Sequence, residues 1–511
     1  MSSGPVDDEI SERRSAGARR RKSSRAPYEQ YPILQTIIQG TLIAALCAII
    51  VWAPVPLGSN RTFYLSVLAL LMGAALVLWG SAAAFGLVRV TEKLRALWPA
   101  ALALGLATAV AFAQVVDLSL VDRVAGTNLT GFGHPIWQLA GETLGAKLPV
   151  YITVDPAKAY PAFLKTFLYA GVFFVAFVLA RRTENARILS VAIVAGGVLC
   201  VFFGFLQRAS GFDFGVLLAG EAVHEQPTRF SSTFANPNHL ATFAGVALIA
   251  ALGLTNEAVS KGIVLNRGRD IAIRSATNVV LGPALFGIIA ALVLIVAIVL
   301  TGSRAGLLSV AAGCFAWAAV LFFSGRSSSG KGAPYFAISM VAVLVAIGLI
   351  ASSQLMTRVD KVSLQDGSRA EIAARSMEAI WASPWAGNGF GAFVSYYPLY
   401  ADDSAGAIVN AAHNDYLESL SDLGLAGGGA LIFAPAYLAF LAGRGAFRRR
   451  KTKTFGAIAA GAAVLCGVHA FFDFSLQVPA VGAALFAVLG VGVAQAWRGE
   501  DEAGGDPRMA A

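Results

Sequence analysis

Long apolar runs dominate the chain and recur at a length suited to crossing a lipid bilayer. A helix needs about 20 residues to span the hydrocarbon core. Runs near this length lie at 33–53, 63–83, 97–116, 161–180, 188–207, 238–254, 278–300, 305–323, 335–352, 425–443, 455–474 and 478–497. The pattern predicts an all-α polytopic membrane protein with about twelve transmembrane helices, and very short turns leave counts of eleven or thirteen open.

The polar stretches between these runs divide the chain into regions. A polar loop at 353–424 is the longest, and within it Ile372, Met377 and Ile380 recur at helical spacing. This spacing predicts an amphipathic helix over 369–383, placed either as a lid or simply at the bilayer surface. The remaining regions are a basic tail at 1–32 that we expect to be disordered, helices one to nine over 33–352, helices ten to twelve over 425–497, and a tail at 498–511.

Composition supports the membrane assignment, and the distribution of charge adds an orientation. The chain is 57% hydrophobic and only 14% charged, which is too apolar for a soluble protein of 511 residues. Its net charge of +9 raises the possibility of nucleic-acid binding. However, if the N-terminus is cytoplasmic, 27 of the 39 Lys and Arg residues fall in cytoplasmic segments. We therefore expect both termini in the cytoplasm, loop 353–424 in the periplasm, and membrane lipid rather than nucleic acid as the partner.

Neither disulfides nor a metal centre is expected. All four cysteines lie within predicted spans, and none is paired by spacing. Asp402 and Asp403 form an acidic pair, but no regular set of histidines or carboxylates at ligand spacing accompanies them. The sequence also lacks nucleotide-binding motifs, so no cofactor is predicted.

Three arginines lie at the predicted outer boundary with few acidic neighbours. They are Arg229, Arg304 and Arg369. An arginine at the end of a membrane helix often only extends its charged group to the lipid–water interface. Each of the three, taken alone, could therefore have this structural role instead of binding a ligand. Together they suggest an anion site, because a guanidinium donates two parallel hydrogen bonds to phosphate. The pyrophosphate of a lipid headgroup is the expected anion.

Two histidines lie at the same predicted boundary. His413 precedes Asn414 and Asp415 at the end of the polar loop, where a neutral imidazole is suited to take a proton from a hydroxyl. A purely structural histidine is the alternative. His469 and Asp473 are spaced i,i+4, which predicts one shared helix face and either support of the site or hydrogen bonding between helices.

These residues resemble the O-antigen ligase and O-antigen polymerase family of bacterial inner-membrane proteins. His413-Asn414, nine residues, then Gly424-x-x-Gly427 fits the family pattern H-[NSQ]-x9-G-x-x-G, and Arg304-x3-Leu308 resembles a second motif. The resemblance is densest over about 229–480. It also includes the segments around Asn236 and Asn238, Pro384 to Gly391, and His469 to Asp473.

The resemblance implies metal-independent transfer of a glycan from undecaprenyl pyrophosphate to an acceptor hydroxyl at the periplasmic face. His413 would be the catalytic base, and Arg229 and Arg304 would hold the pyrophosphate. Arg369 is a weaker match because the following residues lack an expected aromatic. The supporting positions would be Asn236, Asn238, Asn414, Asp415, Gly424, Gly427, His469 and Asp473.

Four functions remain open from the sequence. We favour a ligase whose acceptor is lipid A–core over a polymerase that extends a growing polysaccharide, and protein O-oligosaccharyltransferases share the same motif. A lipid-linked oligosaccharide flippase is the alternative of another class. Such a transporter should have ionisable groups near the middle of the membrane and repeated halves, and neither is evident here.

Overall fold

The structure is a computed structural model that describes residues 31–88, 92–211, 229–265, 282–324, 359–401, 409–449 and 453–497. Within these ranges the chain forms helices and turns without strands. Nine of the described helices are long and apolar enough to cross a membrane. They are α2 (Pro32–Trp52), α3 (Thr62–Ala84), α4 (Trp98–Gln114), α7 (Ala159–Leu179), α8 (Thr183–Ser210), α10 (Pro237–Leu265), α12 (Pro283–Leu300), α13 (Arg304–Ser324) and α17 (Asp415–Arg448). The prediction of an all-helical chain with many candidate membrane spans is confirmed for the described residues.

Two shorter apolar helices complete the bundle, α18 (Lys453–His469) and α19 (Pro479–Ala494). Nearly every residue of α19 is buried, and it packs against α7, α17 and α18. Close approach depends on small residues: a Cβ on Gly313 of α13 would lie 2.7 Å from the carbonyl oxygen of Gly461 in α18. Packing through small residues is typical of helices associating in lipid, where burial of apolar surface gives little driving force. The span predicted at 335–352 and both tails lie outside the described residues.

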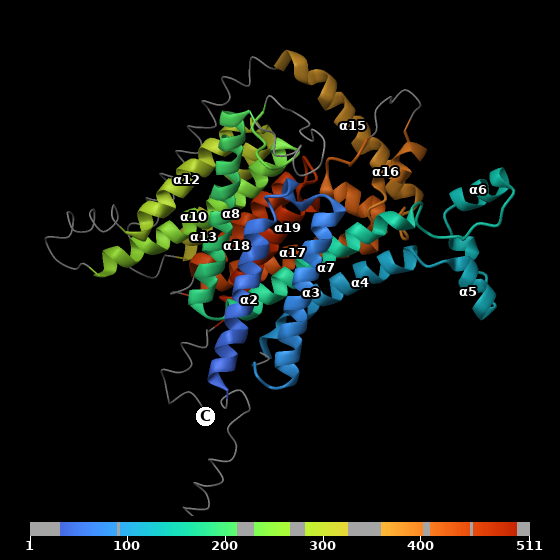
Figure 1. The fold of residues 1–511 in the computed structure, drawn as a ribbon. Helices are drawn as coiled ribbons and strands as arrows, with labels where there is room; N and C mark the ends of the chain where they lie inside the picture. The colour runs from blue at the N-terminus through green and yellow to red at the C-terminus, as the bar shows by residue number, and fades with distance from the viewer. Residues whose placement is uncertain are drawn as a thin grey trace, which may run out of the picture.

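The helices give the bundle two distinct ends. At one end, the Thr233 hydroxyl donates to the Pro54 carbonyl just beyond α2, and the segment after Thr233 leads into α10. The start of α17 lies at the same end, because Asn238 of α10 donates to Asp473, which contacts His413 just before α17. At the other end lie the beginning of α2 and the turn between α7 and α8. Helix α15 (Val359–Ala382) extends along the top of the view in Figure 1, and the short helices α5 (Leu118–Ala125) and α6 (Ile136–Leu144) project from one side. Which end faces which compartment stays a prediction.

Two elements differ in extent from the expectations. Helix α15 begins at Val359 rather than 369, because a glycine within a helix costs only about 1 kcal/mol and Gly367 does not end it. Helix α17 begins at Asp415, within the stretch expected to be loop, and its helical geometry is interrupted at Gly424. The residues directly after His413 are therefore a buried helical segment, 415–423.

Candidate active site

His413 lies at a sharp turn that leads into α17. Its backbone is in the left-handed region, with φ of +50°, and is followed directly by the helix cap Asn414. The Asn414 side chain accepts hydrogen bonds from the backbone N–H groups of Tyr416 and Leu417, both at 3.0 Å. The capped helix thus fixes the backbone beside His413. The His413 side chain keeps 30% of its surface exposed.

Asp473 is the partner of His413. His413 Nδ1 lies 3.1 Å from Asp473 Oδ1, and the carboxylate is fully buried. Its other oxygen accepts from Asn238 Nδ2 at 2.6 Å, and the Phe474 N–H donates to Oδ1 at 2.9 Å. Burial alone would raise the pKa of Asp473, but the bonds from His413 and Asn238 and the nearby His239 hold that pKa below its usual range. An ionised Asp473 favours a proton on His413 Nδ1, which leaves the lone pair on Nε2.

The turn that begins α10 supplies the second support of Asp473. Asn236 Oδ1 accepts a hydrogen bond from the backbone N–H of Asn238 at 2.8 Å. This bond fixes the residue whose side-chain amide donates to the Asp473 carboxylate. His239, the next residue, is buried and packs edge-on against Phe474 at a ring separation of 4.8 Å. Phe474 also packs against His413 at 5.3 Å. Asn236 and Asn238 were predicted as supporting residues, whereas His239 of the same polar segment was not.

The expectation that His469 and Asp473 share a helix face is wrong. Helix α18 ends at His469, and Asp473 lies in the turn that follows, where its backbone N–H still donates to the His469 carbonyl at 3.0 Å. The turn directs the Asp473 carboxylate to His413 instead. His469 is fully buried, and its ring nitrogens have no hydrogen-bond partner among the described residues.

Two of the three arginines meet at one turn, between α12 and α13. Arg229 Nε donates to the Thr301 carbonyl at 2.7 Å, and Arg304 is the exposed first residue of α13. Arg229 begins the ten-residue segment that reaches Asn238, so this turn belongs to the same end of the bundle as His413. Arg369 is an exposed residue of α15, and that helix packs against α17. The three positive charges thus gather at the end of the molecule where His413 is partly exposed.

Buried carboxylates on the first turns of α17 hold the backbone around His413. Glu418 accepts the N–H of Ala412 at 2.8 Å, immediately before His413. Asp415 accepts from the Leu476 N–H at 3.2 Å and from Gln477 Nε2 at 3.3 Å, in the loop that carries Asp473. The two carboxylates therefore fix His413 and the Asp473 loop to one helix. Asp415 was predicted as a supporting residue and Glu418 was not, although its i+3 spacing from Asp415 was an available signal.

The two glycines of the His413 motif have a structural role. Gly424 has φ of +68°, and the following Leu425 N–H donates to the Pro384 carbonyl at 2.7 Å. A Cβ on Gly424 would lie 2.6 Å from the Trp385 carbonyl oxygen, and one on Gly427 would lie 3.1 Å from Val110 of α4. The glycine pair thus allows α4 and the 384–391 segment to approach α17 closely.

Polar side chains lock this contact. Asp422 accepts from the Tyr396 hydroxyl and from the Gly391 N–H, both at 2.7 Å. Gln114, at the end of α4, donates to the Asp422 and Ala386 carbonyls at 2.7 and 2.6 Å. We define residues 384–391 with Gln114, Tyr396 and Asp422 as the clamp. Gln114 was not predicted from the sequence. A single polar residue at the end of an apolar run was the available sign of its role.

Among the described residues, no group of three or more His, Cys, Asp or Glu side chains is arranged to hold a metal ion. Arg229, Arg304 and Arg369 supply positive charge at this end of the bundle. The site thus combines a partly exposed imidazole, a buried carboxylate behind it and several guanidinium groups.

Comparison with known proteins identifies a family over part of the chain. Residues 289–434 match the family model described as O-antigen ligase, and this range contains Arg304, His413, Gly424 and Gly427. No curated protein matches the chain. The matched family is a glycosyltransferase-like one, and it suggests O-antigen ligase or polymerase-type activity with lipid-linked glycans and polysaccharide acceptors. The match over residues 289–434 supports the O-antigen ligase and polymerase family, and together with the apolar helices it points to a multi-pass membrane protein.

Proposed function

We propose that the protein is an O-antigen ligase that transfers a glycan from undecaprenyl pyrophosphate to a hydroxyl of lipid A–core. The reaction takes place without a metal ion, at the periplasmic face of a bacterial inner membrane. The observation that carries this proposal is the His413–Asp473 pair, with Nδ1 3.1 Å from the carboxylate and the imidazole partly exposed. The family match supports an O-antigen ligase or polymerase-type activity.

His413 acts as the general base. Nε2 accepts the proton of the acceptor hydroxyl as its oxygen attacks the anomeric carbon of the donor glycan, so that a new glycosidic C–O bond forms. The bond from that carbon to the pyrophosphate breaks at the same time, and the electron pair leaves with the phosphate oxygen. Asp473 stabilises the imidazolium that results and holds the ring in the reactive tautomer. A positioned base of this kind adds a factor of about 10² to 10⁴ to the rate.

The arginines stabilise the leaving group. Negative charge grows on the pyrophosphate as the anomeric bond breaks, and a fixed guanidinium interacts more strongly with that charge than with the ground state. Arg304 is exposed at the α12–α13 turn, whereas Arg229 is held by the Thr301 carbonyl at the same turn. We assign Arg304 and Arg229 to the pyrophosphate and Arg369 to a supporting position.

A deletion strain tests the proposal through its glycans. If the protein is a ligase, the strain accumulates lipid A–core without glycan and retains polymerised glycan on the lipid carrier. Glycan restricted to single repeats would instead assign the protein as a polymerase. Loss of polysaccharide with lipid-linked glycan trapped on the cytoplasmic face would contradict glycan transfer and favour a flippase.

A further inference from the structure

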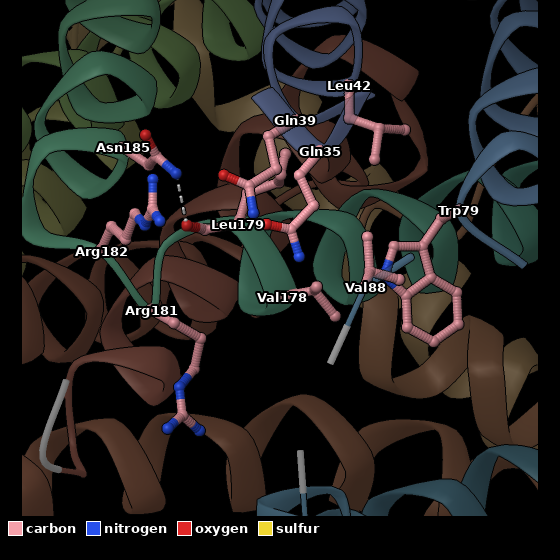
Figure 2. Close-up of a pocket in the computed structure, with 10 residues that line it drawn as sticks. All are labelled: Gln35, Gln39, Leu42, Trp79, Val88, Val178, Leu179, Arg181, Arg182 and Asn185. Carbon is pink, nitrogen blue, oxygen red and sulfur yellow. Dashed lines mark hydrogen bonds between the residues drawn. The ribbon is translucent and has the colours of Figure 1, made fainter. Parts of the chain in front are cut away.

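Helix α7 carries positive side chains in two different settings. Just beyond its last residue, Arg181 and Arg182 lie at the turn to α8, where they line a cavity of about 240 Å³ (Figure 2). Cations at the end of a membrane helix commonly extend to the lipid–water interface. Lys165 lies instead within the membrane-spanning part of α7 and is half-buried. A charge inside a membrane span is costly, so Lys165 needs a compensating group.

Three carboxylates lie along one face of α17. Asp415, Glu418 and Asp422 have the spacing i, i+3 and i+7, and all three are buried. We define these residues as the acidic row. Like charges held close together in a buried setting repel each other, so the members of such a row can be ionised together only with positive charge nearby.

One turn before Lys165, α7 contacts the residue that binds one end of the acidic row. A Cβ on Gly391 would lie 3.0 Å from the Ala162 Cβ, so the two segments approach closely. The Gly391 N–H donates to Asp422 at 2.7 Å. Residues at i and i+3 lie on one helix face, so Lys165 lies on the same face of α7 as Ala162.

One turn after Lys165, α7 contacts the segment that binds the other end of the row. The Tyr169 hydroxyl donates to the Leu476 carbonyl at 2.9 Å, and the Leu476 N–H donates to Asp415 at 3.2 Å. Lys165 precedes Tyr169 by four residues and therefore lies between the two contacts, opposite the middle of the row. Its charge interacts with all three carboxylates, most strongly with Glu418.

Lys165 acts on the row through its charge rather than through a fixed hydrogen bond. Its side chain makes no hydrogen bond or ion pair with the described residues. Glu418 accepts the Ala412 N–H at 2.8 Å, and Ala412 directly precedes His413. One carboxylate and one backbone hydrogen bond thus connect the lysine to the proposed base.

We propose that Lys165 is a positioning residue for glycan transfer. Its positive charge compensates the acidic row and so keeps Glu418 in place on the Ala412 N–H. That bond holds the left-handed backbone at His413, which directs the imidazole to Asp473. Lys165 acts through Glu418 and does not bind substrate. The inference rests on the proposed function, because it takes His413 as the base.

Steady-state kinetics of the full chain in detergent micelles, with undecaprenyl-pyrophosphate glycan as donor and lipid A–core as acceptor, test the assignment. Lys165→Met should lower kcat about ten- to hundredfold, because a displaced His413 misplaces the base, and should leave KM for the donor unchanged. Lys165→Arg keeps the charge and should retain most of the rate. Lys158→Met, which removes an exposed lysine directly before α7, is the matched control and should equal wild type.

A neutral side chain at Glu418 tests the connection from Lys165 to His413. Glu418→Gln keeps an oxygen for the Ala412 N–H and removes one charge from the row, so Lys165→Met should cause a much smaller loss of kcat in this background. An equal loss in both backgrounds would overturn Glu418 as the link. A raised donor KM with unchanged kcat in Lys165→Met would overturn positioning and assign Lys165 to substrate binding. Equal losses in Lys165→Arg and Lys165→Met would overturn the role of the charge.

Amide hydrogen exchange over residues 409–414, followed by mass spectrometry, gives a readout that does not depend on transfer. Lys165→Met should make the Ala412 amide exchange about tenfold faster, because its bond to Glu418 is weakened, whereas Lys165→Arg and Lys158→Met should not. Unchanged exchange in Lys165→Met would overturn the inference. Absence of transfer by the wild type would contradict the proposed function instead, and exchange would still decide whether Lys165 holds this backbone. If Lys165→Met does not fold, Lys165→Gln is the second neutral variant, with the same expected results.

Discussion

Two buried aspartates at the same end of the bundle, Asp473 and Asp422, show how similar burial serves different purposes. Both have almost no exposed surface, and each accepts several hydrogen bonds. Asp422 accepts hydrogen bonds from the Tyr396 hydroxyl and the Gly391 N–H. Neither group presents a further atom that could act as a base. Asp473 instead contacts the ring of His413, whose other nitrogen stays available.

Burial alone therefore does not reveal the role of a carboxylate. Its role depends on which group it contacts. Asp422 holds the clamp closed on α17, so its removal should affect folding. Asp473 holds an imidazole that is 30% exposed, so its removal should affect chemistry. The following predictions separate these two roles.

The largest effect is expected from His413→Ala. Removing the proposed base should lower glycan transfer by about 10² to 10⁴-fold, as measured with purified protein, lipid-linked donor and acceptor. Membrane insertion and the unfolding temperature should stay close to wild type, because the side chain is partly exposed. Transfer at the wild-type rate would remove His413 from the mechanism.

Exchanging the two carboxylates for amides tests the comparison directly. Asp473→Asn should lower transfer by roughly 10²-fold or more, since an amide can hold His413 in the unreactive tautomer, with little change in the unfolding temperature. Asp422→Asn should lower the unfolding temperature, with a cost of about 1–3 kcal/mol for the unsatisfied clamp, while transfer per folded molecule stays nearly unchanged. The reverse pattern would invert our assignment of the two sites.

Arginine substitutions should have an intermediate effect. Arg304→Ala should reduce transfer about tenfold by weakening use of the lipid-linked donor, whereas Arg304→Lys should lose less because it keeps the charge without the planar fork. Transfer assayed over a range of donor concentrations checks this. Equal losses in both variants would point to a structural role at the α12–α13 turn.

The smallest effect on transfer is expected at the glycine pair. Gly424→Ala places a Cβ 2.6 Å from the Trp385 carbonyl at a positive φ, and should destabilise the fold by about 1–3 kcal/mol. Gly429→Ala, in the same helix with open space around its Cβ, is the control and should be neutral. Differential scanning of both variants distinguishes them, and equal unfolding temperatures would contradict the clamp.

Much of the fold follows from the sequence because apolar run length is a local property. The runs that became α2, α3 and α7 are visible without tertiary information. The start of α17 could not be predicted in this way, because residues 415–423 contain three acidic side chains and resemble an exposed loop. Their burial depends on backbone N–H donors from Ala412, Gly391 and Leu476, which are distant in sequence or carry no signal.

The sequence predicted which residues belong to the candidate site, but it did not predict which of them contact each other. His413, Asn238 and Asp473 were each recognised by motif. Sequence spacing assigned Asp473 to His469, since i,i+4 spacing implies a shared face only while the helix continues. Helix α18 ends at His469, so the carboxylate meets a histidine 60 residues away instead.

A double-mutant cycle on glycan transfer tests the central claim, that Asp473 acts through His413, most directly. The rates of wild type, His413→Ala, Asp473→Asn and the double variant are compared in one assay. The account predicts that Asp473→Asn causes no further loss once His413 is absent. Independent losses that multiply in the double variant would contradict it.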